Sequence, residues 1–209
     1  MPLRVSRTVY YIRRLPIAAG ALGSAFMRAG IILCALLLAV PAAAQDYSAA
    51  PAINAQRDGD GGRARASMDV RAPPAVLWGI LSDCTNARRY MRELISCRVL
   101  ERGEGWDVRE HRVRGWPLKP VLRNVSRITL EPNRRLAFHR LDGDWSRSEG
   151  EWRLTPLDGG RGTHVEYELD AAIPSPFPGS WTQSVLVRRM RDSLLDLRRE
   201  AERAAASAG

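Results

Sequence analysis

The chain has 209 residues, 45% of them hydrophobic, and a formal net charge of +9, which suits one globular domain with additional segments. Residues 1–44 contain five arginines and no acidic residue, so the rest of the chain has 27 Lys and Arg against 23 Asp and Glu, a net charge of +4. Because the remaining arginines are scattered and no aromatic-basic motif accompanies them, the composition argues against nucleic-acid binding.

Residues 1–44 have the order of a secretory signal peptide. Basic residues come first, the apolar run Ile31–Val40 follows, and a small-residue cleavage site ends at Ala44. An uncleaved membrane anchor is disfavoured because the run is shorter than the roughly 20 residues that a membrane-spanning helix needs. We therefore expect cleavage near Ala44 and a periplasmic or secreted protein, with translation beginning at either Met1 or Met27.

The segment that follows, residues 45–63, is rich in Ala, Gly, Asp and Pro and has no periodicity. This composition predicts a flexible linker before a folded domain at residues 64–206. Cleavage of the leader would leave Cys84 and Cys97, and an even count in an oxidising compartment predicts a disulfide between them. Two buried free thiols are the alternative. A metal site is disfavoured, because no third Cys and no His stands nearby at ligand spacing.

The domain begins with a predicted strand, Arg65–Val70, and two short helices, one starting near Pro74 and one over Asn86–Met91. Turn signals then recur at intervals typical of an antiparallel meander. The strands expected from them are Cys97–Arg102, Trp106–Arg114, Leu122–Leu130, Leu136–Leu141, Gly150–Thr155 and Thr163–Ala171.

Alternation in the last strand places Val165, Tyr167 and Leu169 on one face and charged residues on the other. This pattern predicts a sheet with one apolar side that a helix covers. Residues 180–206 supply that helix, because their apolar residues recur every three to five positions over about 25 residues. The apolar positions are Trp181, Leu186, Met190, Leu194, Leu197 and Ala201.

The order of these elements, with VLWGILSD after the first strand and RLDGDWSRSEGEWRLTPLDGGRGTHVEYELD near the end, resembles the START-like superfamily, also called SRPBCC or helix-grip. Over about Arg65–Arg203 the chain looks most like its polyketide cyclase/dehydrase and coenzyme Q-binding type group. The resemblance implies an α+β fold in which a curved, six- to seven-stranded antiparallel sheet grips the C-terminal helix. It also implies a cavity between them for lipids, quinones or polyketides. The leader and the cysteine pair depart from the cytoplasmic members.

Candidate ligand-binding residues are the aromatic and apolar side chains expected around that cavity. They are Tyr90, Met91, Trp116, Phe138, Trp145, Trp152, Tyr167, Phe177 and Trp181, with ordinary core packing as the alternative for each. Arg140 shares a predicted face with Phe138 and could meet a carbonyl or anionic head group, although a solvated position is the alternative.

Candidate catalytic groups are few. His164 is expected on the wet face of its strand, whereas His111 and His139 alternate with Arg112 and Arg140, so one of each pair faces inward. No catalytic motif accompanies them, and a base would need a substrate within hydrogen-bond reach. Acidic partners that the sequence offers are Glu110, Glu149 and Glu151.

Together these observations predict an exported protein that binds a lipophilic small molecule without a cofactor or metal. Transient contact with a membrane is compatible with that role. The alternatives are a cyclase/dehydrase-type enzyme acting on such a molecule, or a protein-interaction module of the cell envelope. The sequence specifies neither the ligand nor the oligomeric state.

Overall fold

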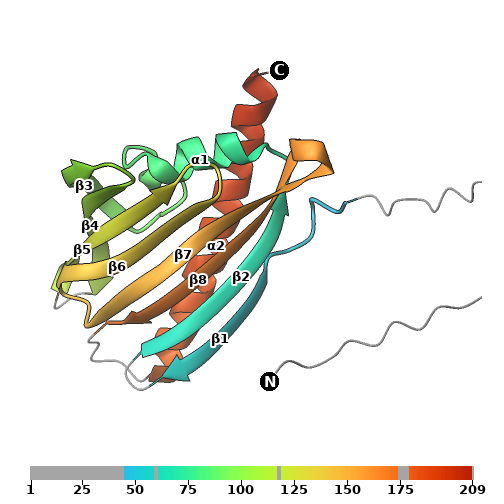
Figure 1. Ribbon diagram of the computed structural model, residues 1–209. Helices are drawn as coiled ribbons and strands as arrows, with labels where there is room; N and C mark the ends of the chain where they lie inside the picture. The colour runs from blue at the N-terminus through green and yellow to red at the C-terminus, as the bar shows by residue number, and fades with distance from the viewer. Residues whose placement is uncertain (1–44, 59–60, 117–118, 174–178, 209) are drawn as a thin grey trace, which may run out of the picture. The chain divides into compact units, whose positions relative to one another are not determined.

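A computed structural model describes residues 45–58, 61–116, 119–173 and 179–208; the expected signal peptide lies outside these residues. One antiparallel sheet curves around a long C-terminal helix, α2, which lies across one face of it (Figure 1). The strands are β1 (Ala52–Asp58), β2 (Gly61–Val70), β3 (Leu94–Gly103), β4 (Trp106–Trp116), β5 (Lys119–Glu131), β6 (Arg135–Gly143), β7 (Arg147–Leu157) and β8 (Gly162–Ala172). The helices are α1 (Pro74–Ser82) and α2 (Gly179–Ala208), with short 3₁₀ turns η1 (Ala87–Arg89) and η2 (Asp158–Gly160).

The strand order is β1-β2-β8-β7-β6-β5-β4-β3, and all neighbours are antiparallel. Strands β3 to β8 form the predicted meander, since each pairs with the next along the chain. The last strand then pairs with β2, with Val70 opposite Thr163, so the two ends of the domain meet inside the sheet. The α+β helix-grip fold is thereby confirmed.

The sheet has eight strands rather than the expected six or seven, and the additional strand is β1. The prediction of a flexible linker at residues 45–63 is therefore wrong for Ala52–Asp58, and β2 begins within the same segment, at Gly61. Only Ile53 and Ala55 of β1 pack against the core, so the segment carries too little apolar periodicity to indicate a strand. Pairing with β2 over its whole length supplies the backbone hydrogen bonds that make it one.

Between β2 and β3 the chain forms α1 and the single turn η1. Helix α1 begins at Pro74 as predicted, because proline suits the first helical turn. The second predicted helix, Asn86–Met91, is only the 3₁₀ turn Ala87–Arg89. Asp83 does not cap that turn; its carboxylate accepts hydrogen bonds from the backbone N–H and the hydroxyl of Thr85 at 2.8 Å each. The chain therefore bends toward β3 after a single turn.

The core lies between the sheet and α2. Leu194, Leu197 and Ala201 of the predicted apolar stripe are fully buried, and Met190 is nearly so. They pack with residues on the inner face, which we define as the face of the sheet that α2 covers. Burial of each such side chain contributes roughly 1.5–3 kcal/mol, so this stripe fixes the helix on the sheet. Within the described part of the chain, no helix is long and apolar enough to span a membrane.

The predicted alternation of β7 and β8 is confirmed. Trp152 lies opposite Tyr167 on the inner face, and the next inner pair is Leu154 and Val165. The intervening charged residues point outward, where Glu151 pairs with arginines of β6 and β7. The register carries this inner face across four neighbouring strands, from Ala66 of β2 through β8 and β7 to Leu136 of β6.

Candidate functional site

The inner face is not uniformly apolar. At the end of the sheet where β6 turns into β7, five residues with polar groups cluster: Asn124, Ser126, Arg140, Trp145 and Ser148. We call these five residues the polar cluster. Regular alternation in β5 places Asn124 and Ser126 on the same face as Ile128. The inward-facing side chains of β5 are therefore apolar at Ile128 and polar at Ser126 and Asn124.

The amide of Asn124 connects two strands of the cluster, β5 and β7. Its nitrogen donates to the hydroxyls of Ser126 at 3.0 Å and Ser148 at 3.3 Å, and all three residues are buried. A register shift after Val125 places Asn124 opposite Gly143 and Ser126 opposite Arg140. These hydrogen bonds make the cluster a buried polar surface on the inner face.

Three buried atoms of the polar cluster lack hydrogen-bond partners among the described residues. They are the side-chain oxygen of Asn124, Nε of Arg140 and the indole nitrogen of Trp145. Arg140 donates through Nη2 to the carbonyl of Gly143 at 3.0 Å, which leaves its Nε free. A buried polar group without a partner costs about 1–3 kcal/mol, and more for a charged group. The polar cluster thus presents two donors and one acceptor that a bound molecule could satisfy.

His111 lies beside this cluster, because it is the cross-strand partner of Asn124. Burial, and to a lesser extent the charge of Arg109, lowers the pKa of His111 to about 4, so its imidazole is neutral near pH 7. The structure also answers which residues of the alternating pairs face inward: His111 and Arg140 do, whereas Arg112 and His139 lie on the outer face.

A wall of aromatic rings lines the inner face next to the polar cluster. Trp152 stacks on Tyr167 with ring centroids 3.9 Å apart, and Tyr90 contacts Trp152 edge to face at 6.4 Å. Burial raises the pKa of Tyr90 to about 12 and also raises that of Tyr167. These rings therefore give the inner face a large aromatic surface.

Phe138 extends the aromatic wall toward the polar cluster. Its ring lies over Gly150, where a Cβ atom would come within 2.8 Å of the Phe138 ring and 2.0 Å of the Glu168 carbonyl. Only glycine permits this close approach. Met91, Trp145 and Trp78 are half-buried against the core. The side chains of Trp116 and Trp181, and the whole of Phe177, lie outside the described residues.

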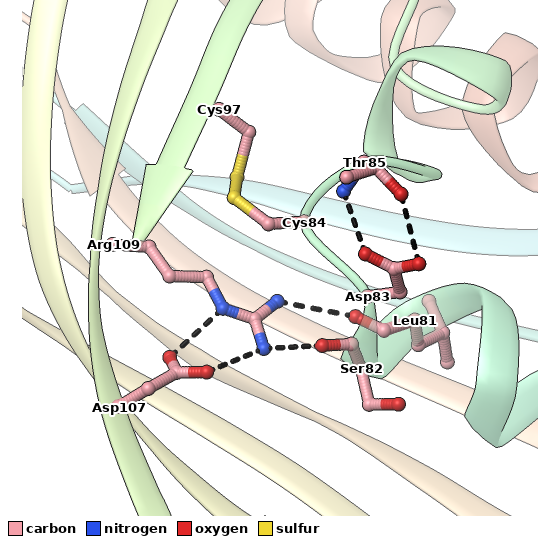
Figure 2. The surroundings of a disulfide bond; sticks show 8 residues. All are labelled: Leu81, Ser82, Asp83, Cys84, Thr85, Cys97, Asp107 and Arg109. Carbon is pink, nitrogen blue, oxygen red and sulfur yellow. Dashed lines mark hydrogen bonds and ion pairs between the residues drawn. A yellow bond between two sulfur atoms is a disulfide. The ribbon is translucent and has the colours of Figure 1, made fainter. Parts of the chain in front are cut away.

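The segment that carries Tyr90 is held in place by a disulfide and an ion pair (Figure 2). The predicted disulfide between Cys84 and Cys97 joins the α1–η1 segment to β3. Close to it, Arg109 forms a bidentate ion pair with Asp107 and donates to the carbonyls of Leu81 at 3.3 Å and Ser82 at 2.6 Å. Both charged side chains are almost completely buried.

Sequence reasoning did not identify the Asp107–Arg109 pair. The sequence did contain a signal for it. Residues two apart in a strand share a face, so Asp107 and Arg109 lie on the same face of β4 as Val113, which is part of the core. The pair attaches the end of α1 to β4, and Tyr90 follows α1 by only a few residues. Its role is therefore positional: it fixes where the aromatic wall begins.

The acidic residues proposed as catalytic partners do not approach the polar cluster. Glu110 accepts a hydrogen bond from Arg123 at 2.7 Å and Glu151 pairs with Arg135, both on the outer face, and Glu149 is exposed. His164 lies on the wet face as predicted and contacts Asp69 at 2.6 Å. Among the residues described, no group of three or more His, Cys, Asp or Glu side chains could hold a metal ion.

Comparison with known proteins agrees with this geometry. A family model described as polyketide cyclase/dehydrase and lipid transport matches residues 70–198, which is more than half of the chain. No curated protein matches the sequence.

Several solved structures share the fold. The Zhui aromatase/cyclase from Streptomyces sp. R1128 is 21% identical, with 76% of this chain and 99% of that chain covered and a TM-score of 0.59. The STAR-related lipid transfer protein from Xanthomonas axonopodis is 16% identical, with coverages of 76% and 96% and a TM-score of 0.61. The human StarD13 (DLC2) lipid transfer and protein localization domain is 11% identical, with coverages of 75% and 87% and a TM-score of 0.63. With its sheet, its gripped helix and its family match, the chain belongs to the polyketide cyclase/dehydrase and lipid transport family of the START/SRPBCC superfamily.

Proposed function

We propose that this domain binds a lipophilic small molecule between the inner face of the sheet and α2, with a polar end of that molecule at the polar cluster. The observation that carries the proposal is the set of buried, unpartnered atoms on Asn124, Arg140 and Trp145. Two of them are donors, so a carbonyl or ester oxygen of the ligand is the group that fits them. The acceptor of Asn124 would take a hydroxyl or amide hydrogen.

The remainder of the ligand would lie along the aromatic wall. Trp152, Tyr167, Tyr90 and Phe138 offer ring surfaces, and each 100 Å² of apolar area buried would contribute about 2.5 kcal/mol before the costs of association. Quinones, phospholipids and polyketides all join an apolar body to carbonyl or ester oxygens. The printed descriptions of the family and its structural neighbours, which name cyclases and lipid transfer, support this chemistry.

The proposal places the protein outside the cytoplasm. The leader at residues 1–44 supports export, and the Cys84–Cys97 disulfide supports an oxidising compartment. Carriage of a lipid or quinone in the cell envelope, with transient contact at a membrane, is the role that follows from these two features.

A titration tests this proposal directly. Purified, delipidated protein is mixed with a short-chain ubiquinone or with phosphatidylglycerol, and tryptophan fluorescence is followed, because Trp145 and Trp152 lie at the site. The Arg140→Met variant should weaken binding about tenfold, since it removes a hydrogen bond to a charged donor. Arg153→Met, on the outer face of the neighbouring strand, is the matched control and should bind normally. Absence of any response to quinones and phospholipids would contradict the proposal.

His111 supports a second candidate, a cyclase/dehydrase-type enzyme. A neutral imidazole on the inner face next to Asn124 could accept a proton from a bound polyketide. The test is turnover of a poly-β-keto substrate by His111→Gln, with the outer-face variant His139→Gln as control. Loss of turnover in the first variant alone would support catalysis, and equal turnover in both would exclude His111 as the acid–base group.

A further inference from the structure

A second pocket, of about 500 Å³, lies away from the polar cluster, where the segment before β1 and the β2–α1 loop meet the C-terminal part of α2. It is lined by Tyr47, Ser48, Arg71, Arg198, Glu202, Ala205 and Ala206. None of these residues belongs to the polar cluster or to the aromatic wall. The volume is within the range of pockets that bind small organic molecules.

Arg198 is the unusual residue of this pocket. It is only 7% exposed, yet no described carboxylate lies within ion-pair distance of its guanidinium. Its Nη2 donates to the carbonyl of Ala49 at 2.8 Å, while its Nε is shielded from solvent and has no partner among the described residues. Neighbouring arginines of α2 differ, since Arg199 pairs with Asp196 and Arg203 with Glu200. Its charge acts on Asp46, whose pKa is lowered by hydrogen bonds from Ser48 and to a lesser extent by Arg198, without a direct ion pair. A buried guanidinium without a direct anionic partner is costly and leaves a place for an anion in this pocket.

Arg71 provides a second cation in the same pocket. Its guanidinium lies over the ring of Tyr47, 5.3 Å from the centroid, and it forms no ion pair with any described residue. Glu202 is the one carboxylate that lines the pocket, and it accepts the backbone N–H of Arg71 at 3.2 Å. Asp46 is close by and accepts two hydrogen bonds from Ser48. The lining therefore carries two guanidinium groups and one carboxylate, with a second carboxylate, Asp46, beside it.

We propose that this pocket is a second ligand site, which binds the carboxylate or phosphate group of a small organic anion through Arg198 and Arg71. Guanidinium groups suit both anions because their planar N–H donors match pairs of anionic oxygens. Tyr47, Ala205 and Ala206 contact the apolar part of the molecule. Glu202 limits the affinity by repulsion and at the same time holds the Arg71 backbone in position.

The test measures the midpoint of thermal unfolding, Tm, of the purified full domain against increasing octanoate, inorganic phosphate or glycerol 3-phosphate. Specific binding to the folded state raises Tm with concentration. A rise with octanoate alone identifies a carboxylate on an apolar molecule, and a rise with both phosphates identifies a phosphate group. No rise with any of the three overturns the proposal.

Variants distinguish this site from other effects of the anions. Arg198→Met should abolish the rise in Tm, because methionine removes the guanidinium that binds the anion. Glu202→Gln should strengthen binding several-fold by removing the like charge. Arg203→Met, an exposed change on the same helix, and Arg140→Met, in the polar cluster, should keep the wild-type response. If Arg198→Met does not fold, Arg71→Gln replaces it, and an unchanged response in that variant contradicts the proposal.

Discussion

The same strands form the outer and inner faces of the sheet, but the two faces differ in whether their polar side chains have partners. On the outer face, Asp170 is held by Arg63 and Arg147, and Glu110 by Arg123, with further arginines nearby. On the inner face, the polar cluster retains buried atoms with no partner among the described residues. Paired charges at a surface contribute modestly to stability and require no ligand, whereas unpartnered buried atoms cost stability and are typical of binding sites.

The buried ion pair of Asp107 and Arg109 is an exception, because it lies on the inner face and is fully paired. Its removal should have the largest effect on stability. Asp107→Ala would leave the buried guanidinium of Arg109 with carbonyl partners only, which should lower the free energy of unfolding by about 3–5 kcal/mol. Urea denaturation of the purified domain measures the loss. A loss below about 1 kcal/mol would show that Arg109 reaches water or another anion in the variant.

The next largest effect concerns the disulfide that ties the aromatic wall to β3. Replacing Cys84 and Cys97 together by serine should cost about 3 kcal/mol, because the two cysteines are 13 positions apart in the sequence and their link restricts the unfolded chain. The same variant should bind ligand less tightly, since Tyr90 follows the released segment. Chemical denaturation and the fluorescence titration check the two parts separately; unchanged ligand affinity would show that packing alone positions Tyr90.

Unfolding stability measured over a range of pH tests the effect of burying His111 on the inner face. The folded-state pKa of about 4 lies below the ordinary value of 6.5, so the unfolded chain binds a proton first as the pH falls. The contribution of His111 to the free energy of unfolding is constant above pH 6.5. It falls by up to about 1.4 kcal/mol per pH unit between pH 6.5 and 4 and is constant again below pH 4. His111→Gln should flatten this slope, and the outer-face variant His139→Gln should not. Equal slopes in the two variants would assign the acid sensitivity to other groups.

The smallest effect is expected on the outer face. Arg65→Ala removes an exposed pair with Glu168, in which the side chain of Arg65 is 78% exposed. Its unfolding free energy should therefore change by less than about 1 kcal/mol, and the change should shrink further in high salt. A larger loss would mean that the outer-face charges act as a coupled network, and the comparison of the two faces would need revision.

Much of the fold could be predicted from the sequence because it depends on local pattern. The apolar stripe of α2, the alternation of β7 and β8, and Pro74 at the start of α1 all follow from residue spacing and backbone chemistry. The disulfide followed from the even cysteine count outside the expected signal peptide. Strand β1 could not be found in this way, since pairing with β2 rather than its own weak pattern makes it a strand.

The polar cluster required the tertiary structure. Which side chains of β4 and β6 point inward depends on how these strands pair with β5, where His111 lies opposite Asn124 and Arg140 opposite Ser126. For this reason the sequence alone could not choose between His111 and Arg112, or between His139 and Arg140. The burial of Arg198 without a direct ion pair was equally hidden, because it depends on which side chains of distant segments reach its guanidinium.

Spacing in the sequence thus determined the strands, the long helix and the cysteine pair, since those features need only the period of the backbone. Cross-strand register and long-range packing decided which polar atoms are buried without partners, because burial is a property of the assembled layers.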